Sequence, residues 1–333
     1  MAETVEVRRS GYATVQDLGR PGRSAYGLPA NGALDQYSAR MANVLCGNED
    51  TAPLVEITAL DFACEPSADV LVAVTGAPAD VTVGGAARPQ WEPIVVPRGQ
   101  SLAVTGIRRG ARVYLAVYGA FEADQLFGSC APDTILGFGR TLQAGDHLAV
   151  AQPWPPLDHP VFRHPLFHLS PPRPHFGGPW TVDVTDGPDL AEFGGSMGAL
   201  LTSDFVVTPQ SNHVGLRMRG QAPQRQARGE VLSRGVPIGA VEVPAGGELL
   251  VLHRGRGVTA GYPVLAVVTS AGLSALGQAR PGDTVRFRRS SVAEAVAAHR
   301  SRRAAVRAVQ GRVATAFEAL GIPVPAHCQR RRS

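Results

Sequence analysis

The sequence contains no lysine, so all 32 of its basic residues are arginines. Without lysine the chain can form neither a Schiff base nor a phosphate-binding loop of the G-x-x-x-x-G-K-[ST] type. A phosphate group would have to be held by arginine, by backbone N–H groups or by a metal. These absences exclude two large classes of enzyme mechanism.

Long apolar runs and clustered cysteines are absent too. No stretch of about 18 or more apolar residues occurs, so we expect no membrane-spanning helix. The first ten residues lack the apolar core of a signal peptide. The four cysteines form no C-x-x-C pair; they are Cys46, Cys64, Cys130 and Cys328. We therefore expect a cytoplasmic chain with reduced thiols.

Aromatic residues are scarce, at 6% of the chain, although the C-terminal part is strongly basic. From Arg288 onward the chain carries ten arginines against only Glu294 and Glu318. A nucleic-acid-binding surface usually interleaves basic and aromatic side chains. We interpret the basic cluster as a solvated or partner-facing helix rather than a nucleic-acid site.

The sequence does contain many short, valine-rich segments that end in glycine or proline. This pattern, with turn residues every eight to twelve positions, is typical of a β-barrel or sandwich. The clearest predicted strands lie at 69–76, 79–85, 92–99, 101–106 and 111–119. The expected fold class is therefore mainly β with some helix (α+β).

The second half of the chain repeats the pattern of the first. "VPRGQSLAV" (96–104) resembles "VPAGGELLV" (243–251), and "LQAGDHLAV" (142–150) resembles "ARPGDTVRF" (279–287). A repeat of this length indicates two similar β domains. The predicted organisation is an N-terminal β domain with a glycine-rich leading loop (1–151), a proline-rich linker (152–180), a C-terminal β domain (181–290), and an arginine-rich helix and tail (291–333). Because the repeat begins later, we interpret the polar segment 11–36 as an addition before the first barrel.

Two helices are expected. Apolar residues at helical spacing predict one over 33–46, and Gly47 provides a stop. Ser291 and Glu294 form an S-x-x-E capping box for a C-terminal helix that ends at Gly321 and Pro323. Its apolar stripe is expected to dock on its own domain rather than on a partner; the stripe comprises Val292, Val296, Val306, Val309, Val313, Phe317 and Leu320.

The proline-rich linker holds four histidines, His159, His164, His168 and His175. No carboxylate or cysteine shares their spacing, and an extended arm cannot easily close a tetrahedral site. We predict no metal site and interpret this segment as a linker or wrapping arm.

Three polar loops that lead into strands could carry chemistry, at 208–220, 229–244 and 252–263. Their amide and guanidinium groups could hold a carboxylate, an amide or a phosphate, although each loop taken alone is more typical of an ordinary turn or hairpin. "GGSMG" (194–198) matches the G-x-S-x-G nucleophile motif, but no strand runs directly into it, so we do not assign Ser196 as a nucleophile.

An ordered set of motifs resembles the KipA family, which is also called allophanate hydrolase subunit 2, the biotin-dependent carboxyltransferase-like family, or the C subunit of 5-oxoprolinase. The set begins with "VQDLGRPG" (15–22) and continues through "SNHVGLRMRG" (211–220), "GAVEVPAGG" (239–247), "AGYPVLAVV" (260–268) and "RPGDTVRF" (280–287). The match covers roughly residues 5–290.

This resemblance implies a pair of cyclophilin-like β-barrels and an obligate KipI-like partner, the B subunit of 5-oxoprolinase, together with a separate LamB/YcsF-like protein, the A subunit. The implied activity is ATP-dependent opening of 5-oxoproline to glutamate, with ATP bound by this chain or by the partner. One alternative is a carboxyltransferase subunit of urea or allophanate metabolism, which would need biotin on another chain because this one lacks lysine. A second alternative is a non-catalytic, KipA-like module that antagonises a kinase inhibitor.

The three polar loops and the resemblance to the KipA family together predict the site residues. The candidate catalytic residues are Asn212, Glu230, Ser233 and Tyr262. The candidate substrate-binding residues are Gln16, Asp17, Arg20, Asn31, Asp35, Arg217, Arg256 and Thr259. The chain departs from the family pattern where His213, Val214, Gly255, Gly257 and Cys130 replace the usual Arg, Met, Asp, Gln and Arg. These departures remove polar groups from the expected site.

Overall fold

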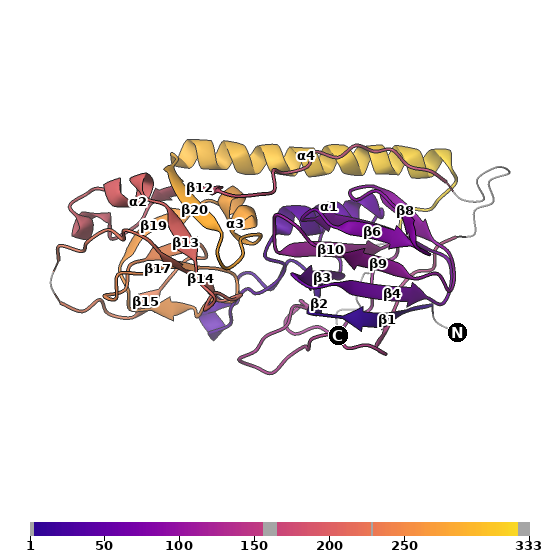
Figure 1. Cartoon of the computed structure of the whole chain (residues 1–333), viewed down its shortest axis with the longest axis horizontal. Coiled ribbons are helices and arrows are strands. Elements are labelled where there is room, and N and C mark those ends of the chain that lie inside the picture. The colour runs from indigo at the N-terminus through magenta and orange to yellow at the C-terminus, as the bar shows by residue number, and fades with distance from the viewer. Residues whose placement is uncertain (1–2, 156–164, 228, 326–333) are drawn as a thin grey trace. The chain divides into compact units, whose positions relative to one another are not determined.

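The computed structural model describes residues 3–155, 165–227 and 229–325. Contacts divide the chain into two compact units that interleave along the sequence (Figure 1). The first unit comprises Met1–Leu18, Gln36–His175 and Arg303–Ser333, and the second comprises Gly19–Asp35 and Phe176–Arg302.

The first unit consists of two antiparallel sheets and one helix, α1 (Gln36–Leu45), which packs against β5 and β10. The six-stranded sheet has the order β11-β1-β4-β9-β6-β7, and the five-stranded sheet has the order β2-β3-β10-β5-β8. The strands are β1 (Thr4–Ser10), β2 (Ala13–Gln16), β3 (Leu54–Thr58), β4 (Phe62–Pro66), β5 (Val70–Gly76), β6 (Asp80–Val83), β7 (Ala86–Ala87), β8 (Pro93–Val96), β9 (Leu102–Thr105), β10 (Arg112–Val117) and β11 (His147–Ala149).

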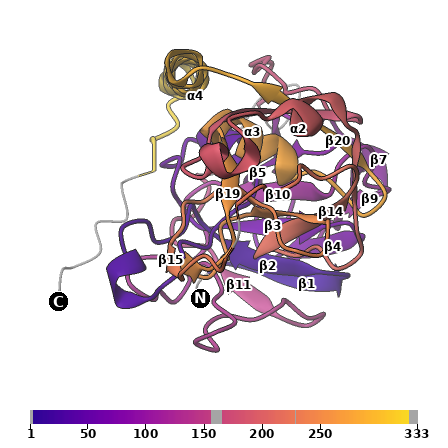
Figure 2. The ribbon, with the colours of Figure 1, turned by 90° about the vertical axis from the view of Figure 1, so that its left-hand side faces the viewer.

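The second unit contains a closed barrel with the order β12-β19-β16-β17-β14-β13-β20, in which the parallel pair β12 and β20 completes the circuit. A separate two-stranded ribbon pairs β15 with β18 outside the barrel circuit, and β15 is labelled in Figure 2. The strands are β12 (Trp180–Asp186), β13 (Phe205–Val207), β14 (Gly215–Arg219), β15 (Arg234–Gly235), β16 (Ala240–Glu242), β17 (Leu249–Leu252), β18 (Thr259–Ala260), β19 (Val264–Val268) and β20 (Thr284–Arg289).

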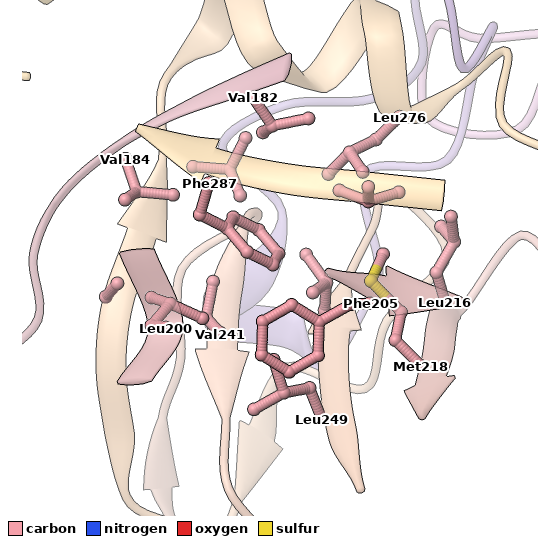
Figure 3. Close-up of a cluster of buried hydrophobic side chains, with 14 of the residues drawn as sticks. Val182, Val184, Leu200, Phe205, Leu216, Met218, Val241, Leu249, Leu276 and Phe287 are labelled. Carbon is pink, nitrogen blue, oxygen red and sulfur yellow. The ribbon is translucent and has the colours of Figure 1, made fainter. Parts of the chain in front are cut away.

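Alternate residues of the barrel strands point inward and fill the barrel with apolar side chains. Phe205 and Phe287 meet edge to face there, with ring centroids 5.6 Å apart, and Val241 and Leu249 are fully buried beside them (Figure 3). The short helices are η1 (Ser24–Tyr26), η2 (Leu190–Phe193), α2 (Gly198–Thr202) and α3 (Ser270–Leu276). Thr269 caps α3 by accepting a hydrogen bond from the Gly272 N–H group at 3.1 Å, as N-cap threonines do.

The long C-terminal helix α4 (Val292–Ala319) begins with the predicted capping box. The Ser291 hydroxyl accepts from the Glu294 N–H group at 3.2 Å, and Glu294 accepts from the Ser291 N–H group at 2.7 Å. Only part of the predicted stripe is buried: Val292 is 70% exposed, whereas Phe317 is fully buried against Tyr118 and Trp154 of the first unit. The C-terminal part of α4 thus packs on the first unit rather than on the barrel that precedes it in the sequence.

The prediction of a mainly β chain with a few helices is confirmed, and each of the five clearest predicted strands coincides with a strand. The interpretation of 11–36 as an addition before the first barrel is wrong. Residues 13–16 form β2 and pair with β3 inside the first unit, and Gly19–Asp35 belongs to the second unit. The described part of the proline-rich arm packs on the first unit, where Tyr37 donates to the Pro172 carbonyl. His159 and His164 lie outside the described residues.

Candidate functional site

The polar segment 19–35 forms a closed loop in the second unit. The Arg20 N–H group donates to the Ala30 carbonyl at 2.7 Å. Gly19 has a φ of +84°, and a Cβ atom there would collide with the carbonyl oxygens of Ala30 and Asn31, so only glycine fits. Asn31 itself adopts a left-handed conformation, with a φ of 51°, which asparagine tolerates better than most residues. The glycine-rich sequence is therefore required by the tightness of the loop.

Two contacts attach this segment to the rest of the second unit. The Asn31 N–H group donates to the Arg254 carbonyl at 2.9 Å. The Gln278 amide donates to the Asp35 carboxylate at 2.8 Å, and both side chains are buried. The segment therefore lies beside the loop that follows β17 and the turn that follows α3.

His253 fixes the start of the loop after β17. It is fully buried, and its backbone N–H group donates to the Val214 carbonyl at 2.8 Å. Its Nδ1 atom accepts from the Arg254 N–H group at 2.9 Å, and its Nε2 atom lies 3.1 Å from the Leu273 carbonyl. Because Nδ1 must accept and a carbonyl can only accept, this network assigns the neutral tautomer with the proton on Nε2.

Two departures from the family pattern, His213 and Gly255, are in contact with each other. The Gly255 N–H group donates to the His213 carbonyl at 3.0 Å, and a Cβ atom on Gly255 would collide with the His213 ring. An aspartate at 255 would therefore not fit beside this histidine. The adjacent Asn212 is exposed, and its side chain accepts from the Val214 N–H group at 2.8 Å, so it supports its own turn.

Arg256 is the most unusual cation of this loop. It is only 6% exposed, and its Nε group donates to the Val236 carbonyl at 3.0 Å. Within the described residues, its buried Nη1 group has no hydrogen-bond partner, and no ion pair forms with it. Desolvation by burial lowers the pKa of Arg256. A buried guanidinium without a counter-charge is energetically unfavourable.

A second buried ionisable group, Glu242, stands on the outer side of β16. Val241 points into the barrel core, so its neighbour Glu242 faces the outer cluster to which Leu250 and Val264 belong. In register it lies opposite those same two residues. Glu242 is 1% exposed, and neither carboxyl oxygen has a hydrogen-bond partner among the described residues. Desolvation raises the pKa of Glu242 to about 7.

Four of the residues predicted from the sequence lie in this region: Arg20, Asn31, Asp35 and Arg256. A fifth, Asn212, lies in the neighbouring turn. Others lie elsewhere. Glu230, Ser233, Thr259 and Tyr262 are exposed in and around the β15–β18 ribbon, and Arg217 is exposed on β14. Their roles stay predictions.

Two candidates belong to the first unit. Asp17 accepts hydrogen bonds from the Ser129 hydroxyl at 2.6 Å and the Cys130 N–H group at 2.8 Å. The Gln16 amide donates to the Thr14 hydroxyl at 3.2 Å. Asp17 thus holds the segment that contains Cys130, the residue that stands where the family usually has an arginine.

The sequence analysis missed His253, Gln278 and Glu242. For Glu242 a signal was present, because it is an acidic residue inside the apolar strand "GAVEVP". Nothing local marks Gln278, since its partner Asp35 is more than 240 positions away.

The described part of the chain shows little sign of a metal site, a membrane-spanning helix or a reactive cysteine. No group of three or more His, Cys, Asp or Glu side chains there could hold a metal ion. None of the described helices is both long and apolar enough to cross a membrane. Cys46, Cys64 and Cys130 are buried free thiols, and burial raises the pKa of Cys64 to about 12, which keeps it protonated and unreactive. Cys328 lies outside the described residues.

Comparison with known proteins gives consistent matches. The family described as the carboxyltransferase domain, subdomain A and B, matches residues 26–289. The C subunit of 5-oxoprolinase from Escherichia coli (strain K12) is 32% identical over 298 residues, which cover 88% of this chain and 93% of the relative. The protein of the same name from Haemophilus influenzae is 31% identical, covering 85% and 90%.

A solved structure shows the same fold. The crystal structure of the Kluyveromyces lactis urea amidolyase superimposes with a TM-score of 0.82 at 27% identity. The match covers 92% of this chain but only 20% of that protein.

Proposed function

The chain belongs to the family of carboxyltransferase domains with subdomains A and B, and from this premise we propose that it is the C subunit of a 5-oxoprolinase-type complex. The observation that carries the proposal is the reciprocal coverage of the bacterial relatives, 88% of this chain and 93% of the E. coli protein. In the urea amidolyase the same fold occupies one fifth of a much larger chain. The higher identity to the bacterial C subunit, 32% against 27% for the urea amidolyase, favours the 5-oxoprolinase assembly.

The reaction is the hydrolysis of a lactam. The ring C–N bond breaks, the hydroxyl of water joins the carbonyl carbon, and the nitrogen becomes the amine of glutamate. A separate water hydrolyses ATP to ADP and phosphate. Fixed N–H and guanidinium donors can stabilise negative charge that develops on the lactam oxygen.

The function requires other proteins. We place a KipI-like partner (the B subunit) and a LamB/YcsF-like partner (the A subunit) beside this chain, in the cytoplasm. ATP would bind to this chain or to the KipI-like partner. Because the chain lacks lysine, any phosphate contact that it makes must come from arginine or backbone N–H groups.

A carboxyltransferase subunit of urea metabolism is the second candidate. The urea amidolyase fold favours it, since the match covers 92% of this chain. In that case a biotin attached to another chain would deliver the carboxyl group.

A non-catalytic binding module is the third candidate. The contact between His213 and Gly255 favours it, because the loop has closed over a position where the family usually carries an acidic side chain. Such a module would bind its partner without turnover.

The test is to co-purify the chain with its KipI-like and LamB/YcsF-like partners and to measure glutamate release with ATP and 5-oxoproline. We expect glutamate formation that requires all three proteins and ATP. Carboxybiotin-dependent carboxylation of urea would instead support the second candidate. A stable complex without either activity would support the binding module.

A further inference from the structure

We infer that Arg256 is the carboxylate-binding residue of this chain, and that its ligand class is a small amide bearing a carboxylate rather than a neutral amide such as urea. The inference deepens and rests on the proposed function, since 5-oxoproline is a lactam with a carboxylate on its ring. It starts from the guanidinium of a residue that is only 6% exposed and has an unpartnered Nη1 group within the described structure.

Arginine cannot escape the cost of burial by losing its proton. Its pKa remains far above neutral pH even when burial lowers it. The charge therefore persists inside the protein, and the Val236 carbonyl compensates only one of its N–H groups. A buried cation of this kind is stabilised only by an anion.

The other buried ionisable groups on this side of the barrel do not supply that anion. Among the described residues neither carboxyl oxygen of Glu242 has a partner, so Glu242 forms no ion pair with Arg256. The nearby His253 is neutral by its hydrogen bonds and carries no negative charge. Within the described residues no carboxylate reaches Arg256, and we assign its counter-charge to a bound anion.

A carboxylate matches the geometry of the unsatisfied donor. The planar guanidinium binds a carboxylate through two parallel N–H···O bonds. Gly255 and Gly257 flank Arg256. Gly255 is buried against the His213 ring, whereas Gly257 is exposed, and a Cβ atom there would meet only the Thr259 carbonyl oxygen, at 3.5 Å. A ligand can therefore approach the backbone beside Arg256 only from the Gly257 side.

The experiment compares 5-oxoproline with 2-pyrrolidone, which is the same lactam ring without the carboxylate. Binding of both compounds to the assembled complex is measured by calorimetry, for the wild type and for Arg256→Met, Arg256→Lys and Arg219→Met. Arg219 is the matched control, because it is an exposed arginine of the same unit paired with Glu248.

We expect the wild type to prefer 5-oxoproline, and Arg256→Met to lose about 100-fold or more of that affinity with little change for 2-pyrrolidone. Arg256→Lys should retain part of the preference, and Arg219→Met all of it. Arg256→Met should be at least as stable to heat as the wild type, because it removes an uncompensated charge.

Three results would overturn the inference. One is an unchanged preference in Arg256→Met, and another is a wild type that binds both lactams equally or neither. The third is an Arg256→Met chain that no longer assembles with the KipI-like partner, which would make Arg256 a contact to that partner rather than to the ligand. If 5-oxoproline binds through Arg256 but the complex releases no glutamate, the proposed function fails while the carboxylate site stands.

Discussion

The two units of this protein differ in how fully their buried carboxylates are partnered. In the described part of the first unit every buried acidic side chain has partners: the carboxylates of Asp17, Glu56, Glu92 and Asp133 each accept from nearby N–H, O–H or guanidinium groups. In the second unit Asp189 is paired with Arg234. Glu242 and the Nη1 group of Arg256, however, are buried without partners among the described residues.

Buried charges that are paired stabilise the fold, whereas buried charges without a partner remain available to bind a ligand. Native proteins satisfy nearly all of their buried polar groups, and groups that remain unsatisfied with perturbed pKa values concentrate at functional sites. The comparison therefore supports our proposal that the ligand-binding site of this chain lies in the second unit. It also predicts that equivalent substitutions in the two units will change stability in opposite directions.

The largest effect is expected for Glu92→Ala in the first unit. The Glu92 carboxylate accepts from the N–H groups of Leu169 and Ser170 at 2.7 and 2.8 Å and so anchors the proline-rich arm. Removing it leaves these donors unsatisfied and opens a cavity. We expect a loss of about 3 to 4 kcal/mol in the free energy of unfolding, measured by urea denaturation. Glu92→Gln, which keeps one acceptor, should lose less.

Glu242→Gln should raise the free energy of unfolding instead of lowering it, and the gain should depend on pH. The pKa of Glu242 is raised from an ordinary 4.5 to about 7 in the folded protein. Below pH 4.5 both states are protonated and no penalty exists. As the pH rises from there through the folded pKa, the wild type loses stability, because the unfolded chain releases its proton more readily. Since one pKa unit corresponds to about 1.4 kcal/mol, the loss approaches about 3 kcal/mol.

Glutamine does not titrate, so Glu242→Gln should match the wild type near pH 4 and exceed it by up to about 3 kcal/mol near pH 8. Urea denaturation at both pH values measures the difference. Equal stability of the two proteins at the higher pH would show that Glu242 is paired after all, and the contrast between the units would disappear.

A third substitution tests whether residues 19–35 belong to the second unit. A Cβ atom on Gly277 would lie 2.6 Å from the Leu34 carbonyl oxygen and 2.9 Å from the Asp35 nitrogen. Gly277→Ala should therefore displace the segment and cost about 2 kcal/mol. Faster cleavage within 19–35 under limited proteolysis would report the displacement. The control is Gly311→Ala in α4, where nothing lies within 4 Å, and which should gain up to about 1 kcal/mol.

Local patterns predicted the elements well and the site poorly, for a physical reason. Valine-rich segments that end in glycine identified β5 and β10, and the capping box identified the start of α4, because these features depend on neighbours in sequence. The attachment of Asp35 to Gln278 and the closure of the barrel by β12 and β20 depend on residues that lie far apart. Local sequence patterns do not encode such contacts, and for this reason they predict incorrectly that segment 11–36 is an addition before the first barrel.

The smallest expected effect concerns α4, which begins in the second unit and ends in the first. Ser291→Ala removes the hydroxyl that accepts from the Glu294 N–H group and should cost about 1 kcal/mol. Because the first turns of α4 are exposed, whereas Val309, Val313 and Phe317 are buried in the first unit, the loss should be local. Hydrogen exchange should accelerate near Val292 and remain slow near Phe317. Acceleration along the whole helix would instead mean that both units depend on this cap, and that α4 couples their stabilities.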